Sequence, residues 1–185
     1  MLRTTIFPGR YVQGVGALAS LGDEIARFGQ AAFLIVDPFV AENIGDRIER
    51  GTGDTVDPHM ERFGREASDE EIDRLTDMVP EGRIEVIVGV RGGKTLDIAK
   101  AVAHHTQLRV VSVPTIASTD APTSGLVVIY TPEGAFKRYL FLPTNPDVVL
   151  VDTQGIAEAP VKFLVSGMGD ALATWFEAES ARQFS

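Results

Sequence analysis

The sequence predicts an α/β protein built on a Rossmann-like, mostly parallel sheet with flanking helices. Short runs of β-branched and other apolar residues alternate with helical stretches along most of the chain, which is typical of parallel strands joined by helical crossovers. The strongest runs are apolar at nearly every position, as expected of strands that helices cover on both faces. The composition, with 44% hydrophobic, 8% aromatic and 23% charged residues in a chain of 185, is ordinary for a globular protein. It excludes intrinsic disorder, collagen and coiled coil.

Four apolar runs are the predicted core strands, and four helices are expected around them. The strands are Ala32–Val36, Ile84–Val90, Arg109–Val113 and Val148–Val151. The helices are Ala17–Phe28, Phe39–Glu49, Asp69–Met78 and Thr95–His104. Ser68 and the acidic residues after it form a helix start, because a hydroxyl caps free N–H groups and carboxylates favour the positive end of the helix dipole. An antiparallel hairpin appended to the sheet is predicted from two apolar runs and the turn between them, Leu126–Tyr130, Pro132–Gly134 and Phe136–Phe141.

The pattern changes after Asp152, where strand-like runs stop. Leu164, Met168, Leu172 and Trp175 recur at helical spacing, and neither glycine nor proline ends the helical sequence that follows. We therefore expect an α/β domain over residues 1–152 and the first helices of a second, all-helical domain over residues 153–185. A sheet domain that passes into one or two helices and stops there is expected to be truncated.

Charge and residue usage exclude several classes of function. The 17 Lys and Arg against 26 Asp and Glu give a net charge of −9, which disfavours nucleic acid and anionic membranes as partners. The chain has no cysteine, so disulfides, thiolate nucleophiles and cysteine-ligated metals are excluded. No apolar run approaches the roughly 18–20 residues of a membrane span, and the first residues lack the apolar core of a signal peptide. A cytoplasmic protein is expected.

Two glycine clusters compete for the role of phosphate cradle. The first, Gly14–Ala19, imitates a dinucleotide fingerprint, and Asp37 follows about 20 residues later. The residues before it include Pro8 and Gly9 and make a poor central strand, so this match is weak. The second, Gly89–Asp97, follows a strong strand and opens a helix, where free N–H groups and the helix dipole favour a pyrophosphate. The alternative for the second cluster is a plain strand-to-helix turn.

Several polar residues are expected where the predicted strands end. Asp37 follows a strand and is placed to accept hydrogen bonds from both hydroxyls of an adenosine ribose, which favours NAD over NADP; the alternative is a turn residue before Pro38. The loop Pro114–Gly125 lies where open α/β sheets bind ligands. Asp120 is its only charge, and its hydroxyl residues are Thr115, Ser118, Thr119, Thr123 and Ser124. The alternative for this loop is a solvated connection.

Aspartate and histidine patterns give no metal site from the residues alone. Asp170 falls roughly opposite the apolar stripe of its helix, and the pattern favours a helix cap or a solvated position for it. His104 and His105 end a predicted helix, where cations complement the dipole, and His59 is expected in a loop. No pair of histidines has the spacing of metal ligands on a helix, so none is assigned to a metal.

Four segments together resemble a known family. In chain order they are GGKTLDIAKA (Gly92–Ala101), PTIASTDAPTS (Pro114–Ser124), NPDVVLVDT (Asn145–Thr153) and GMGDALATWFEA (Gly167–Ala178). The sequence is similar, from about Tyr11 to its last residue, to the glycerol dehydrogenase group of the metal-dependent, or iron-containing, alcohol dehydrogenase family, whose fold is shared with dehydroquinate synthase. The resemblance implies that residues 1–152 bind NAD and that residues 153–185 begin a metal-binding helical domain.

The resemblance also implies an activity and a set of site residues. The complete enzyme would be a homo-oligomer that oxidises glycerol, or a similar small vicinal diol, to dihydroxyacetone by metal-assisted hydride transfer to NAD. Asp120 would contact the polyol, and Asp170 would be the first of three ligands of a Zn²⁺ ion. The residues implied for the cofactor are Asp37 at the ribose, Gly92, Gly93 and Lys94 at the pyrophosphate, and Thr115, Ser118, Ser124, Leu126 and Tyr130 elsewhere.

Two departures from the family keep alternatives open. Arg91 stands where the family usually has a glycine, and its side chain would either crowd the backbone or add charge near a phosphate. The other two metal ligands, both histidines, fall in a helical half that this sequence lacks. The alternatives are a truncated NAD-binding module without catalysis and another enzyme of the superfamily, such as a glycerol-1-phosphate dehydrogenase or a dehydroquinate synthase-like lyase. Those enzymes would need basic residues at the substrate, and the segment Ser118–Ser124 offers none.

Overall fold

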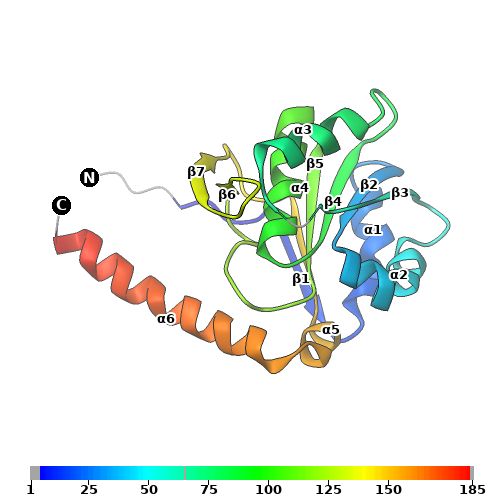
Figure 1. Cartoon of the computed structure of the whole chain (residues 1–185). Coiled ribbons are helices and arrows are strands. Elements are labelled where there is room, and N and C mark those ends of the chain that lie inside the picture. The colour runs from blue at the N-terminus through cyan, green and yellow to red at the C-terminus, as the bar shows by residue number, and fades with distance from the viewer. Residues whose placement is uncertain (1–4, 65, 184–185) are drawn as a thin grey trace.

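Six parallel strands form one sheet in the computed structural model of the chain, which describes residues 5–64 and 66–183 (Figure 1). Their order across the sheet is β1-β8-β5-β4-β2-β3, and every neighbouring pair is parallel. The strands are β1 (Arg10–Gly14), β2 (Ala31–Val36), β3 (Asp57–Arg62), β4 (Val86–Arg91), β5 (Arg109–Pro114) and β8 (Val148–Asp152). The α/β class and the mostly parallel sheet that the sequence predicts are confirmed.

Apolar side chains cover both faces of this sheet and form two layers of core. In β2, Leu34 and Val36 belong to the layer under η1 (Ala17–Ser20), α1 (Leu21–Ala26) and α2 (Pro38–Thr52). Phe33 and Ile35 belong to the opposite layer, under α3 (Asp69–Met78) and α4 (Gly93–Thr106). Successive side chains of a strand point to opposite faces, so a strand with helices on both sides is apolar at every position. This is why the central strands are visible in the sequence.

The two edge strands are the ones that the sequence analysis missed. β1 pairs with β8 only, and β3 pairs with β2 only. The expectation that His59 lies in a loop is wrong, because it lies in β3 with its ring stacked on Phe33 at a centroid distance of 5.3 Å. Pro58 is accommodated because an edge strand has one side free of the hydrogen-bond ladder. Half-exposed edge strands lack the continuous apolar pattern, so their sequences resemble loops.

The predicted helices are present, with changes at their ends. The first is divided into the 3₁₀ turn η1 and the short helix α1 rather than running continuously over 17–28. This segment packs closely on the end of α2, since a Cβ at Gly22 would collide with the carbonyl oxygen of Thr52. The cap predicted for α3 is confirmed, because the Ser68 hydroxyl accepts the backbone N–H of Glu71 at 3.3 Å. Tertiary packing therefore determines where η1 and α1 begin and end, whereas a local cap determines where α3 begins.

The predicted hairpin forms with the expected bounds, as β6 (Leu126–Tyr130) and β7 (Phe136–Phe141), which pair antiparallel. It is a separate two-stranded ribbon and does not extend the main sheet, so the expectation that it is appended to the sheet is corrected. Val127 and Ile129 of β6 are fully buried in the core layer that includes α3 and α4. The apolar face of the hairpin therefore packs beside the helical layer, which already covers this side of the sheet.

The chain leaves the sheet through α5 (Thr153–Glu158) and α6 (Val161–Gln183). Figure 1 shows α6 extending away from the sheet. The helix predicted from the spacing of Leu164, Met168, Leu172 and Trp175 is confirmed, and these side chains are between 48% and 68% exposed. Within residues 5–64 and 66–183, no helix is long and apolar enough to cross a membrane. The proposed boundary between residues 152 and 153 coincides with the end of β8. Residues 1–4, 65, 184 and 185 of the two predicted domains lie outside the described residues.

Candidate cofactor and metal site

The parallel strands bring the predicted site residues to one edge of the sheet, where their carboxyl ends meet. Asp37 follows β2, Arg91 ends β4, residues 115–125 follow β5 and Asp152 ends β8. A cavity of about 410 Å³ lies at this edge. A neighbouring cavity of about 510 Å³ is lined by Thr119 and Asp120 of the loop and by parts of β1, β8 and α6. The edge therefore offers two adjoining spaces, of which the second holds the acidic loop residue.

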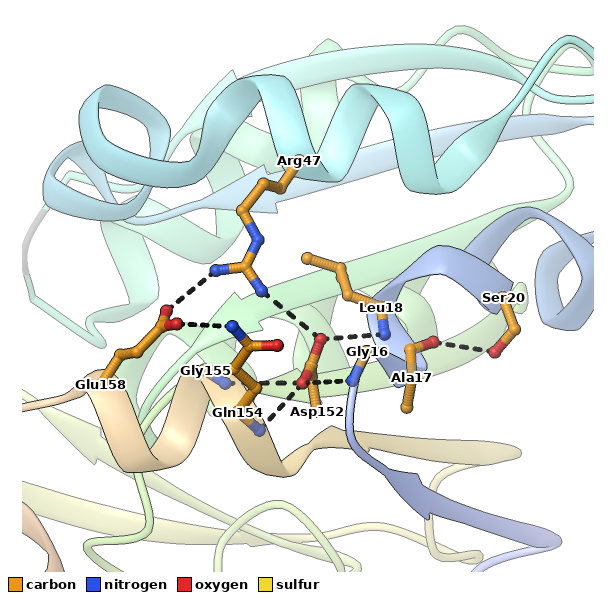
Figure 2. Close-up of polar contacts among 9 residues, drawn as sticks. All are labelled: Gly16, Ala17, Leu18, Ser20, Arg47, Asp152, Gln154, Gly155 and Glu158. Carbon is orange, nitrogen blue, oxygen red and sulfur yellow. Dashed lines mark hydrogen bonds and ion pairs between the residues drawn. The ribbon is translucent and has the colours of Figure 1, made fainter.

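The first glycine cluster, Gly14–Ala19, holds a carboxylate of the protein itself (Figure 2). Asp152 Oδ1 accepts the N–H of Gly16 at 3.0 Å, and its Oδ2 accepts the N–H of Leu18 at 3.2 Å. Oδ1 also accepts two N–H groups at the start of α5, at 3.0 and 3.4 Å. Backbone N–H groups that converge in this way otherwise bind phosphate. The fingerprint-like glycines thus form an internal anion site, and the second cluster remains the candidate for binding phosphate.

Asp152 joins three segments of the molecule. Burial by itself raises the pKa of the Asp152 carboxyl, but the backbone hydrogen bonds from Leu18, Gly16 and α5 outweigh burial and hold the pKa below its ordinary value. Arg47 of α2 lies 3.6 Å from Asp152 Oδ2 and 3.0 Å from Glu158 (Figure 2). Sequence reasoning missed these residues. The one available signal was an aspartate between a strand and a helix, which is a common helix cap.

The second glycine cluster forms the turn from β4 into α4, as predicted. Gly92 directly precedes the helix, which begins at Gly93. A Cβ at Gly92 would lie 2.6 Å from the end of the Ile116 side chain, so the turn packs against the loop after β5 and a larger residue there would displace Ile116. The first N–H groups of a helix have no intrahelical partner and carry the positive end of the dipole. This turn is therefore suited to bind an anionic group such as a pyrophosphate.

Lys94 and Tyr130, both predicted to contact the cofactor, lie together beside this turn. The Lys94 ammonium is 4.7 Å from the centroid of the Tyr130 ring and 2.7 Å from a carboxylate oxygen of Glu66. Glu66 was not foreseen, because it comes from the segment before α3. A phosphate at the turn would compete with Glu66 for Lys94, so the lysine is positioned near the cradle and held by an exchangeable ion pair.

Asp37 and Arg91 form an ion pair at the ends of β2 and β4. Arg91 Nη1 lies 2.9 Å from Asp37 Oδ1, and the guanidinium carbon is 5.1 Å from the centroid of the Phe39 ring. Asp37 Oδ1 also accepts the N–H of Phe39 at 2.8 Å and so caps α2. Asp37 thus has the local structural role before Pro38 that the sequence analysis gave as the alternative to binding ribose. The pairing also places Arg91 against Asp37 and α2.

A buried lysine holds the loop that follows β5. Lys100 of α4 is fully buried, and its ammonium donates to the carbonyl oxygens of Ala121, Ser124 and Leu126 at 2.9, 3.1 and 2.6 Å. It also lies 2.9 Å from Asp97 Oδ1. Burial raises the pKa of the Asp97 carboxyl, against the opposing effect of Lys100. Lys100 therefore fixes the backbone of the loop that carries Asp120.

Asp120 and Asp170 are brought together by a close approach of α6 to the loop. A Cβ at Gly167 would collide with the carbonyl oxygen of Ala117, so glycine is needed where the helix crosses the loop. Three residues further along α6, Asp170 Oδ2 accepts the N–H of Asp120 at 3.1 Å. Among the described residues, no group of three His, Asp or Glu side chains comes together at a distance suited to a metal. Asp170 supplies one carboxylate oxygen of the kind that zinc accepts as a ligand, and the residues that the structure describes do not complete a metal site around it.

The remaining predicted residues line the same loop and hairpin. The Thr115 N–H donates to the carbonyl oxygen of Arg91 at 2.9 Å, which ties the loop to the end of β4. Ser118 lies where Gly167 of α6 approaches the loop. Ser124 and Leu126 contribute two of the three carbonyl oxygens that accept hydrogen bonds from the Lys100 ammonium. His104 and His105 lie in the last turn of α4, at the opposite end of that helix from Gly93.

This arrangement defines a Rossmann-like α/β protein with a glycine-containing strand-to-helix turn at the carboxyl edge of its sheet. The family profile described as iron-containing alcohol dehydrogenase matches residues 8–153. The chain belongs to the iron-containing alcohol dehydrogenase family.

Within this family, the chain is similar in sequence and structure to glycerol dehydrogenases. The chain is 60% identical over 183 residues to a glycerol dehydrogenase of Thermotoga maritima and 46% identical over 181 residues to one of Citrobacter freundii. These matches cover 99% and 97% of the chain but 50% of each relative, so the chain spans about half the length of the relatives that it matches. The crystal structure of a probable glycerol dehydrogenase from Sinorhizobium meliloti superposes with a TM-score of 0.90 at 43% identity, over 97% of this chain and 49% of that one.

Proposed function

We propose that this chain is the NAD-binding half of an enzyme that oxidises glycerol, or a similar small vicinal diol, to dihydroxyacetone. The observation that carries the proposal is the hydrogen bond from the Asp120 N–H to the Asp170 carboxylate, in the loop whose Thr119 and Ala121 side chains lie beside Gly93. The loop after β5 and α6 thereby bring two aspartates from different segments to the carboxyl edge of the sheet. The identity to named glycerol dehydrogenases supports the same reading.

The chain's own residues would divide the work between cofactor and substrate. Gly92, Gly93 and the first turn of α4 would hold the pyrophosphate through backbone N–H groups, with Lys94 as an added positive charge. Asp37 would accept a hydrogen bond from the adenosine ribose. Asp120 would accept a hydrogen bond from a hydroxyl of the polyol and orient the carbon that loses hydride toward the nicotinamide.

A divalent metal would complete the reaction centre in the full enzyme. When bound, such a metal lowers the pKa of a coordinated hydroxyl and so prepares it for oxidation. Asp170 would provide one ligand to it, and the ligands that are missing from this chain would come from a further helical half. In this chain alone, Asp170 contributes an oriented carboxylate whose Oδ2 is held by the Asp120 N–H.

Two measurements test the proposal. Calorimetry of the 185-residue chain with NAD should give saturable binding, and Gly92→Val should abolish it because the side chain would fill the turn beside Ile116. Gly45→Ala is the matched control, since no atom lies within 4 Å of a Cβ at that helical position. Supplying the C-terminal half of a related glycerol dehydrogenase as a second polypeptide should restore NADH production from glycerol. A folded chain without NAD affinity would contradict the proposal.

A further inference from the structure

We infer that Arg91 relaxes the choice between NAD and NADP, because it sits where a ribose 2′-phosphate would bind. The inference rests on the proposed function, since it assumes a dinucleotide at the carboxyl edge of the sheet. It concerns which dinucleotides that site accepts. An aspartate after β2 alone predicts exclusion of NADP, because its carboxylate would repel a 2′-phosphate. In this chain the aspartate is not alone.

The backbone at Arg91 has a conformation that favours glycine. Its φ is 151°, and Arg91 and Gln107 are the non-glycine residues with positive φ among the described residues. Glycine adopts such angles without a steric penalty, whereas a residue with a Cβ is strained there. An arginine at this position is therefore held by its side chain. The interactions that hold it are the ion pair with Asp37 and the contact with the Phe39 ring.

The direction of the Arg91 side chain decides whether it crowds the backbone of the glycine turn or adds charge near a phosphate. Its guanidinium contacts Asp37 and Phe39, both at the start of α2. The glycine turn, in contrast, leads from Arg91 into α4. Arg91 therefore adds positive charge at the ribose side of the site and does not lie over the pyrophosphate turn. Both partners of the ion pair are about one-fifth exposed, so they are accessible to a ligand at this edge.

The charge balance around the ribose position is consequently not negative. Asp37 Oδ1 already accepts two hydrogen bonds, from Phe39 and Arg91, and within the described residues no group donates to Oδ2. Oδ2 thus remains for one ribose hydroxyl of NAD. A 2′-phosphate would meet the Asp37 carboxylate together with the Arg91 guanidinium, and guanidinium groups bind phosphate through paired N–H donors.

The test compares affinities for NAD and NADP, measured by calorimetry on the same 185-residue chain. Arg91→Gly suits the backbone, so it should fold, and it should raise the ratio of Kd(NADP) to Kd(NAD) by about tenfold, the size of one charge-assisted phosphate contact. Arg91→Lys should keep most of the parent's ratio, because it retains the charge at the same backbone position. Any general change at the pyrophosphate turn affects both dinucleotides and cancels in the ratio.

Arg109→Ala is the matched control. Arg109 also pairs with an aspartate, Asp147, at 3.0 Å and lies 6.0 Å from a phenylalanine ring, but it begins β5 at the opposite edge of the sheet. Its loss should leave the ratio unchanged. An Arg91→Gly chain that binds NAD with an unchanged or lower ratio overturns the role of Arg91 and leaves the proposed function intact. A folded chain that binds neither dinucleotide overturns both.

Discussion

Replacing Asp152 tests whether the first glycine cluster is an internal anion site. In the structure its carboxylate accepts four backbone N–H groups from two segments and faces Arg47. Asp152→Ala removes all of these acceptors at once. The side chain is nearly buried, with a relative exposure of 7%, so water reaches the abandoned donors poorly.

The expected loss of stability is the sum of three contributions. The Leu18 N–H is buried, and a buried donor without a partner costs about 1–3 kcal/mol. The N–H groups of α5 lose their cap, which costs about 1 kcal/mol, and the partly buried Gly16 N–H adds a similar amount. Asp152→Ala should therefore lower the free energy of unfolding by about 3–5 kcal/mol, a large part of the 5–15 kcal/mol that is typical of a domain. Asp152→Asn keeps one acceptor oxygen and should lose less.

Urea unfolding followed by circular dichroism measures these differences. Asp147→Ala is the matched control, because Asp147 accepts a single backbone N–H, that of Val110, and its side chain is 24% exposed. The alanine variant at Asp152 should lose at least twice as much stability as the control. Equal losses in the two variants would refute the assignment of Gly14–Ala19 as the cradle of an internal carboxylate.

The same site predicts a pH dependence of stability. The pKa of Asp152 is lower in the folded chain than its ordinary value, so the folded state favours the carboxylate. Its contribution is complete above the unfolded pKa of about 4 and is lost as the pH falls through the lower folded pKa. The stability difference between the parent chain and Asp152→Asn should therefore shrink below about pH 4. A difference that grows on acidification would contradict the sign of this shift.

Three further outcomes are expected. Asp120→Ala, measured with the missing half supplied, should raise KM for glycerol about tenfold and leave NADH affinity unchanged; a collapse of NADH affinity instead would assign the loop to the cofactor. Lys100→Met should destabilise the chain by about 3–5 kcal/mol, because it leaves Asp97 buried without its cation, and should weaken NAD binding; unfolding and calorimetry would detect both effects. The 185-residue chain, dialysed against a weak chelator, should retain no stoichiometric zinc and should not oxidise glycerol. One tightly bound zinc per chain, lost in Asp170→Ala, would mean that the missing ligands are in this chain.

The sequence by itself determined the elements whose environment is the same along their whole length. Both faces of the sheet are covered at β2, β4, β5 and β8, so the sequences of these strands are continuous apolar runs. The turn from β4 into α4 was also predicted from the sequence, because adjacent glycines directly before an apolar helical stretch are a local signal of a strand-to-helix turn. β1 and β3 were not predicted, because each lies at an edge of the sheet, and which strands lie at the edges depends on the strand order of the whole sheet.

Only the tertiary structure decided which side chains act together. Arg91 meets Asp37, 54 residues away, and the N–H of Asp120 meets Asp170, 50 residues away. Asp152 accepts a hydrogen bond from Gly16, 136 residues away, so the glycines that resemble a phosphate-binding fingerprint bind a carboxylate of the protein itself. These pairings depend on the order of strands in the sheet and on their register. Strand order and register arise from the packing of the whole core, so the local pattern around each residue does not specify them.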